Sequence, residues 1–126
     1  MSRKLKLQQT NVETQEQFDE VVLAKSYDKL VLVDVYKGWS GPCEIMQPTF
    51  EYLLINIDNA VNLVEFVTID QENMKKFMPS ASVVPEGHGC RPLFAVVKDE
   101  QVKEVIEGCN APTLIQTVST ILDVEI

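Results

Sequence analysis

Three cysteines and one histidine are the side chains of this chain with the most evident capacity for chemistry. Cys43, Cys90 and Cys109 are far apart in the sequence, and no Cys-x-x-Cys or His/Cys cluster has zinc-ligand spacing. Because three is an odd number, at least one thiol stays unpaired even under oxidation. His88 stands alone in Glu-Gly-His-Gly, a context typical of a solvated loop histidine. We therefore predict no metal site and expect any chemistry to be thiol chemistry.

The strands that would position these residues are indicated by apolar and β-branched runs. The segment Leu30–Tyr36 is nearly all apolar, which predicts a central strand buried on both faces, with Asp34 as its one carboxylate. A second buried strand is predicted at 61–69, and an antiparallel hairpin at 93–97 and 102–106. The alternation at 4–7 predicts a short edge strand.

Apolar residues spaced by three and four predict the helices. Thr14 and Gln17 predict a capping box for the first helix, and Pro48 lies inside the second, where it should kink the helix. The apolar face of that second helix would consist of Ile45, Met46, Phe50, Leu53, Leu54 and Ile57. The predicted helices span 15–25, 42–57, 72–77 and 112–122. The order β-α-β-α-β-α-β-β-α predicts one α/β domain over 1–126, a mixed sheet with helices on both faces.

The segment Val31–Cys43, Val-Leu-Val-Asp-Val-Tyr-Lys-Gly-Trp-Ser-Gly-Pro-Cys, resembles the active-site segment of the thioredoxin family, V-D-F/V-x-x-x-W-C-G-P-C. Pro48 and Pro92 match the family's helix proline and cis proline, and Gly108 follows Pro92 by the family's spacing. The resemblance covers essentially the whole chain and implies the thioredoxin fold. It also implies a groove for extended protein segments, formed by Trp39, Cys90, Arg91, Pro92, Gly108 and Cys109.

The chain departs from the family at the attacking position. In thioredoxins the first motif cysteine attacks as a thiolate and the second resolves the mixed disulfide. Here Ser40 takes the first position and Cys43 the second, and a hydroxyl cannot form a disulfide. We therefore expect the dithiol-disulfide oxidoreductase activity to be lost, with no catalytic residue and no cofactor. The degenerate motif is Trp39, Ser40, Gly41, Pro42 and Cys43.

The resemblance also bears on the buried carboxylate and the other thiols. Asp34 matches the family's buried aspartate, but the position of its lysine partner holds Phe66, so a raised pKa is expected for Asp34. Asp34 either relays a proton to Cys43 or is a core residue without a task, which we favour. Cys90 or Cys109 could pair with Cys43 or with a partner's thiol, although three reduced thiols are favoured. The loop at 78–91 is longer than in compact thioredoxins and could dock a partner or shield the motif.

Two segments narrow the resemblance to one branch of the family. Val-Asp-Val-Tyr-Lys-Gly-Trp at 33–39 and Gly-Cys-Asn-Ala-Pro at 108–112 are similar to thioredoxin-like light chains of axonemal outer-arm dynein, and to thioredoxin modules fused to nucleoside diphosphate kinase domains. No kinase region follows in this sequence, which favours the light chain. This resemblance implies a subunit that binds dynein heavy or intermediate chains in the axoneme of a cilium or flagellum, with cytoplasm as its location before assembly. Pairing with a second thioredoxin-like light chain stays open.

Composition agrees with a protein partner. The 126 residues are 45% hydrophobic and carry a net charge of -8, so nucleic acid and anionic membrane are disfavoured and a basic protein surface is favoured. No signal peptide or membrane span is predicted. Two alternatives to a structural light chain stay open. One is a single-thiol redox protein that forms mixed disulfides through Cys43, and the other is a chaperone-like scaffold module.

Overall fold

The centre of the protein is a five-stranded mixed sheet. The computed structural model describes residues 7–37, 45–78 and 93–124. The strands lie in the order β1-β3-β2-β4-β5, with β1, β3 and β2 parallel and β4 antiparallel to both of its neighbours. This confirms the predicted α/β class. The strands are β1 Gln9–Val12, β2 Leu30–Tyr36, β3 Val64–Asp70, β4 Leu93–Lys98 and β5 Gln101–Glu107.

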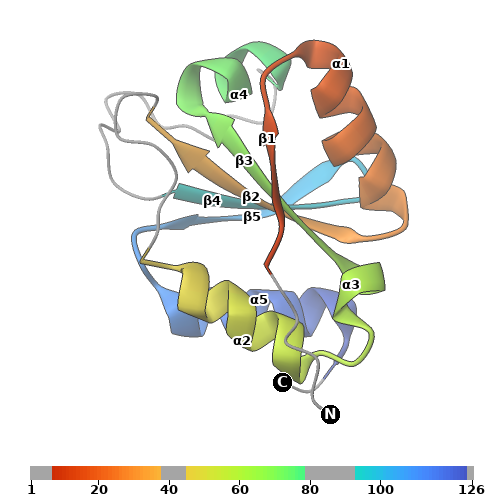
Figure 1. Cartoon of the computed structure of the whole chain (residues 1–126), viewed down its shortest axis with the longest axis vertical. Helices are drawn as coiled ribbons and strands as arrows, with labels where there is room; N and C mark the ends of the chain where they lie inside the picture. The colour runs from red at the N-terminus through yellow and green to blue at the C-terminus, as the bar shows by residue number, and fades with distance from the viewer. Residues whose placement is uncertain (1–6, 38–44, 79–92, 125–126) are drawn as a thin grey trace.

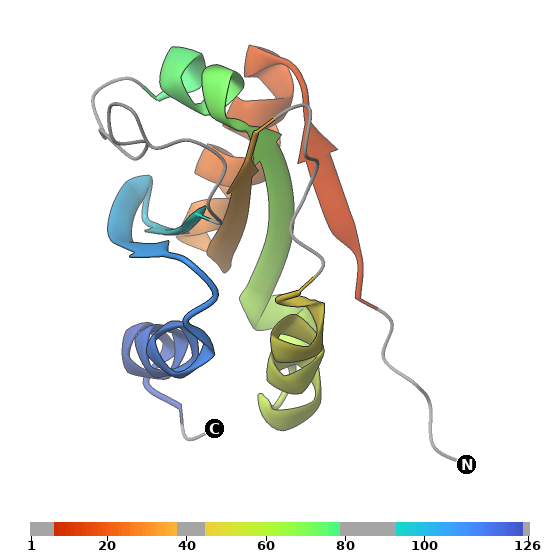
Figure 2. The ribbon, with the colours of Figure 1, turned by 90° about the vertical axis from the view of Figure 1, so that its left-hand side faces the viewer.

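Helices cover both faces of the sheet, as predicted. Figure 1 shows α1 and α4 over one face and α2, α3 and α5 over the other, and Figure 2 shows the two layers from the side. No helix in 7–37, 45–78 or 93–124 is long and apolar enough to cross a membrane. The helices are α1 Gln15–Gln17, continued by a π-helical segment Phe18–Ala24 and a 3-10 turn Lys25–Tyr27, then α2 Gln47–Asn56, α3 Ala60–Leu63, α4 Gln71–Phe77 and α5 Ala111–Leu122.

The predicted capping box begins α1. The Thr14 hydroxyl accepts a hydrogen bond from the Gln17 amide at 3.2 Å, and the Gln17 side chain accepts one from the Thr14 amide at 3.3 Å. Two amides of the first helical turn, which have no acceptor within the helix, are thereby satisfied. Phe18 and Val22 then anchor the helical segment on the sheet as fully buried residues.

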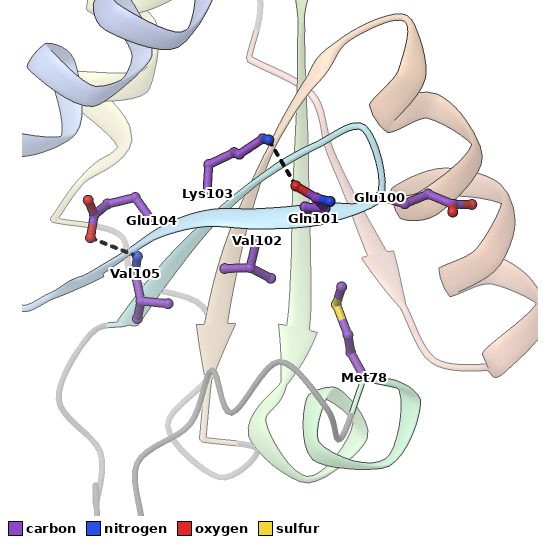
Figure 3. Close-up of a pocket in the computed structure, with 7 residues that line it drawn as sticks. All are labelled: Met78, Glu100, Gln101, Val102, Lys103, Glu104 and Val105. Carbon is purple, nitrogen blue, oxygen red and sulfur yellow. Dashed lines mark hydrogen bonds between the residues drawn. The ribbon is translucent and has the colours of Figure 1, made fainter.

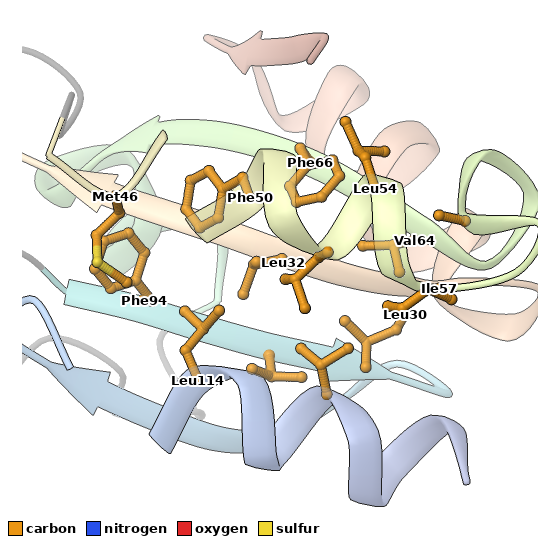
Figure 4. Close-up of a cluster of buried hydrophobic side chains, with 14 of the residues drawn as sticks. Leu30, Leu32, Met46, Phe50, Leu54, Ile57, Val64, Phe66, Phe94 and Leu114 are labelled. Atoms are coloured by element: carbon orange, nitrogen blue, oxygen red, sulfur yellow. The ribbon is translucent and has the colours of Figure 1, made fainter. Parts of the chain in front are cut away.

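The core forms two layers because successive side chains of a strand point to opposite faces. Leu30 and Leu32 of β2 belong to the cluster under α2 and α5, drawn in Figure 4, whereas Val31 and Val33 belong to the cluster under α1 and α4. The first cluster is centred on Phe50, whose ring lies 5.4 Å from that of Phe66 and 5.8 Å from that of Phe94. The central strand is therefore buried on both faces.

The first strand and the third strand differ from their predicted bounds. The edge strand is Gln9–Val12 and not 4–7; Leu7 is outside it, and residues 4–6 are outside the described part of the chain. Parallel pairing with β3 decides its place, because Val12 opposite Ile69 buries a valine that the alternation at 4–7 could not supply. The third strand begins at Val64, since Asn59 in a left-handed conformation starts α3 just before it.

The predicted kink at Pro48 is wrong for the helix described. α2 begins at Gln47, so Pro48 lies in the first turn, where an amide hydrogen has no partner within the helix. The predicted start at Pro42 is outside the described residues. Ile45 is also not part of the buried face, because 73% of it is exposed.

The β4–β5 hairpin turn consists of Asp99 and Glu100, which both have positive φ, 54° and 62°. The turn is fastened to the 3-10 segment by Ser26, whose carbonyl accepts from the Asp99 amide at 2.8 Å. The Ser26 hydroxyl accepts from the Glu100 amide at 2.8 Å and donates to the Leu23 carbonyl at 2.6 Å. Ser26 is fully buried, so these bonds fix the hairpin against the sheet.

Replacing Glu100 by glycine is expected to stabilise the protein. Two-residue turns with positive φ at both positions favour glycine at the second, because side chains are strained in that region. Glu100→Gly keeps the amide that donates to Ser26, and should raise the free energy of unfolding by about 1 kcal/mol and Tm by roughly 3–5 °C. Glu100→Ala removes the same carboxylate but keeps the Cβ. If Glu100→Ala raised Tm as much as Glu100→Gly in thermal denaturation, the gain would not come from relief of backbone strain.

Candidate functional site at the end of the sheet

Three segments that carry predicted site residues meet at one end of the sheet. β2 ends at Tyr36, just before the motif, and β4 begins at Leu93, directly after Pro92. Leu93 is paired with Val35 on one side and with Glu107, the last residue of β5, on the other. The strand register thus places the described flanks of the motif, of Pro92 and of Gly108 side by side.

Asp34 lies in the sheet just below this end. Only 1% of the residue is exposed, and its Oδ1 atom is buried. The register sets it opposite Thr68 on β3 and Phe94 on β4. Phe66, two pairs further down the strand, is buried against Phe50 in the apolar cluster. An aromatic ring thus fills the position where the resemblance places a lysine, which fits a buried carboxylate without that cation.

A hydrogen-bonded group of polar side chains, Asn11, Tyr36 and Thr68, lies at the same end of the sheet as Asp34 and was not predicted from the sequence. The Asn11 side-chain oxygen accepts from the Tyr36 hydroxyl and from the Thr68 hydroxyl, both at 2.9 Å. Partial burial and the neighbouring carboxylate of Asp70 raise the pKa of Tyr36 above its ordinary value, so the phenol keeps its proton and donates. The sequence did contain a sign of this group, because Asn11 and Thr68 are polar residues that directly adjoin valine in their strands. Only the parallel register, with Asn11 opposite Thr68 and Thr68 opposite Asp34, shows that they meet.

Comparison with known proteins settles the family. The thioredoxin family model matches residues 9–120, most of the 126 residues. The chain belongs to the thioredoxin family. A crystal structure of a poplar thioredoxin h, 27% identical, superimposes with a TM-score of 0.63 over 93% of this chain and 98% of that one.

Two curated relatives differ in how much of their length this chain spans. It is 30% identical over 125 residues to human "Thioredoxin domain-containing protein 3", covering 98% of this chain but only 20% of the relative. It is 34% identical over 90 residues to "Dynein 16 kDa light chain, flagellar outer arm" of Chlamydomonas reinhardtii, covering 71% of this chain and 54% of the relative. The chain thus spans about a fifth of the first relative and about half of the second.

Most of the predicted thioredoxin site lies outside the described residues. This holds for Trp39, Ser40, Gly41, Pro42 and Cys43, for Cys90, Arg91 and Pro92, and for the loop at 78–91 apart from Met78. The groove and any pairing of Cys43 with Cys90 or Cys109 therefore stay predictions. Within 7–37, 45–78 and 93–124, no group of three His, Cys, Asp or Glu side chains could hold a metal ion.

Gly108 and Cys109 are the two predicted groove residues that the structure describes. Gly108 has φ +79° and turns the chain out of β5, and Cys109 follows as an exposed thiol. Asn110 then caps α5, because its side chain accepts a hydrogen bond from the Thr113 amide at 3.3 Å. This short connection holds an accessible thiol at the end of the sheet where the motif begins.

Gly108→Ala is expected to destabilise the protein through its backbone alone. A Cβ at this position would meet no atom within 4 Å, so the cost comes from the left-handed φ and not from a clash. The free energy of unfolding should fall by about 1 kcal/mol. Asparagine tolerates a left-handed backbone better than alanine does. Gly108→Asn should therefore lower the free energy of unfolding, measured by urea denaturation, by less than half as much as Gly108→Ala. Equal losses for the two variants would show that φ is not the cause.

A hollow of about 500 Å³ lies along β5, away from these residues. It is lined by Val102, Val105 and other side chains of the hairpin, with Met78 pointing toward the strand from the end of α4 (Figure 3). Charged Glu100, Lys103 and Glu104 share its rim with the two valines. The lining contains no described residue of the predicted thioredoxin site.

Proposed function

We propose that this thioredoxin-family chain is a redox-inactive subunit of ciliary outer-arm dynein that binds dynein heavy or intermediate chains. The observation that carries the proposal is Ser40, which stands at the family's attacking position in a chain that matches the family from residue 9 to residue 120. The flagellar outer-arm light chain among its relatives supports the choice of dynein. The fold is kept while the chemistry of the motif is lost, which favours a binding role.

Catalysis of thiol-disulfide exchange requires two thiols that act in turn. A thiolate attacks one sulfur of a substrate disulfide, the other sulfur leaves as a thiolate, and a second thiol must then attack the mixed disulfide to release product. With Ser40 in place of the attacking thiol, Cys43 is the one sulfur of the motif. Any mixed disulfide at Cys43 would have no resolving partner within the motif, so turnover would stop after one event.

The partner and the location follow from the same proposal. The net charge of -8 suits basic surface on a large partner and disfavours nucleic acid and anionic membrane. The chain would be made in the cytoplasm and assembled into the axoneme of a cilium or flagellum, with dynein heavy or intermediate chains as contacts. A second thioredoxin-like light chain would be a further candidate partner.

Fractionation of cilia tests this proposal. A tagged chain expressed in ciliated cells should be found in axonemes, be released by high salt together with outer-arm dynein, and sediment with it in a density gradient. It should be absent from axonemes of cells that lack outer arms. A tagged chain that stays in the soluble cytoplasmic fraction, or that persists in axonemes without outer arms, would contradict the proposal.

A single-thiol redox protein is the second candidate, and the exposed thiol of Cys109 favours it. Such a protein would form mixed disulfides with partner thiols under mild oxidation. Alkylation followed by mass spectrometry would then find a cysteine blocked by a partner peptide. Complete and independent labelling of all three cysteines after mild oxidation would exclude this candidate.

A further inference from the structure

The outer side of α2 carries an apolar stripe that the sheet does not use. Ile45 and Ile55 are 73% and 71% exposed, Tyr52 is 42% exposed, and Pro48 is exposed between them. These four residues follow the spacing i, i+3, i+7, i+10, the pattern of a helix seam. Ile45 lies in the turn just before α2, and at 100° per residue the helical residues Pro48, Tyr52 and Ile55 lie within an arc of about 60°. We call these four residues the α2 stripe.

The α2 stripe is separate from the face that packs into the core. Met46, Phe50, Leu53, Leu54 and Ile57 of the same region are buried. They lie on the opposite side of the helix and contact the sheet and α5 (Figure 4). Single exposed apolar residues are ordinary on a protein surface, but an aligned series along one helix face is typical of an interaction site. The stripe starts two residues after Cys43, at the end of the degenerate motif.

Charges on this layer have one sign. The described residues 45–64 and 108–124, which contain α2, α3 and α5, include Glu51, Asp58 and Asp123 and no lysine or arginine. None of these three carboxylates forms an ion pair with another described residue. On the rest of the fold, by contrast, Glu65 lies 3.4 Å from Lys25 and 3.0 Å from Lys29. The described side chains of this layer therefore leave the negative charge of Glu51, Asp58 and Asp123 without an ion pair, and the cation that reaches the layer from the sheet, Lys29, donates to the Val61 carbonyl at 3.0 Å.

We propose that the α2 stripe is the docking surface for one amphipathic helix of the partner protein, with apolar residues at three-four spacing and lysines or arginines beside them. The apolar seam would pack against Ile45, Tyr52 and Ile55, and the basic residues would face Glu51 and Asp58. This inference rests on the proposed function for the partner's identity, a dynein heavy or intermediate chain. It assigns contact to α2 and not to the groove predicted from the family.

Photocrosslinking from two matched tyrosine positions tests the proposal. The full chain would carry p-benzoylphenylalanine at Tyr52 or, as the control, at Tyr27, which is 55% exposed on the 3-10 segment outside this layer. Each protein would be irradiated with outer-arm dynein extracted from cilia, and the crosslinked segment identified by mass spectrometry. We expect position 52 to crosslink to a segment with three-four apolar spacing and flanking Lys or Arg, with at least about tenfold the yield of position 27.

The outcomes separate this inference from the proposed function. A segment of the expected pattern in a protein other than a dynein chain would support the stripe and contradict the function. Dynein crosslinked through position 27 alone would support the function and contradict the stripe. Equal yields, no crosslink from position 52, or an acidic or non-periodic segment would overturn the docking surface.

Substitution provides an independent measurement of the same surface. Ile55→Lys is expected to weaken dynein binding by about tenfold or more. Glu51→Lys should weaken it by a few fold at low salt, and high salt should remove this difference from the natural chain. Tyr27→Lys, on the 3-10 segment, should change it less than about twofold. Because all three side chains are exposed, thermal denaturation should show folded variants. Unchanged binding by folded Ile55→Lys would overturn the proposal.

Discussion

In an insulin-reduction assay with thioredoxin reductase and NADPH, the natural chain should show no turnover above the uncatalysed rate, whereas Ser40→Cys should exceed it by at least about a hundredfold. A serine hydroxyl stays protonated near neutral pH, and its oxygen cannot replace either sulfur of a disulfide. The substitution restores an attacking thiol three residues before Cys43. Oxidation of NADPH, followed as the loss of its absorbance, measures the rate.

Two controls connect this expected gain to the pair of sulfurs. Ser40→Ala should behave like the natural chain, because the hydroxyl has no part in the chemistry. Adding Cys43→Ser to Ser40→Cys should abolish turnover, since the mixed disulfide would lose its resolving thiol. Turnover by the natural chain that disappears in Cys43→Ser would show that the single motif thiol is sufficient and that the chain is an active oxidoreductase.

Phe94→Ala is expected to have the largest effect on stability. Phe94 is fully buried, lies beside Asp34 in the register, and contacts the ring of Phe50 edge-on at a centroid distance of 5.8 Å. Removing the ring loses its burial and leaves a cavity between the sheet and α2. The free energy of unfolding should fall by about 3–5 kcal/mol, and Tm by roughly 10–20 °C.

Tyr52→Ala is the matched control for this loss. Tyr52 is an aromatic residue on α2 with 42% of its surface exposed, so its truncation should change stability by less than about 0.5 kcal/mol. Urea denaturation of the two variants compares them directly. A loss below about 1 kcal/mol for Phe94→Ala would contradict the packing described for the core around Phe50.

Local patterns were sufficient to predict most of the elements. The buried run Leu30–Tyr36, the capping box at Thr14, the hairpin and the last helix were all predicted within a residue or two. Each depends on residues close together in sequence, whose spacing reports burial directly. The first strand was misplaced because pairing with β3 selects it, and that pairing lies more than fifty residues away in the chain.

The parts of the site that were missed depend on contacts between distant segments. Asn11, Tyr36 and Thr68 come from three strands, and only the register brings their hydroxyls and amide together. The α2 stripe was not predicted from the sequence, for another reason. Ile45 was assigned to the buried face by its type, and only the position of the sheet shows that it points to solvent. Apolar residues on both sides of a helix do not reveal which side faces the core.

We propose that this thioredoxin-family chain holds dynein without thiol chemistry, and quantitative affinity isolation of outer-arm dynein measures whether it does. The natural chain and Cys43→Ser would each be incubated with dynein extracted from cilia, in excess dithiothreitol. We expect equal, stoichiometric recovery of dynein heavy and intermediate chains with both proteins. Loss of dynein on reduction or in Cys43→Ser, or recovery of assorted thiol enzymes in place of dynein, would contradict it.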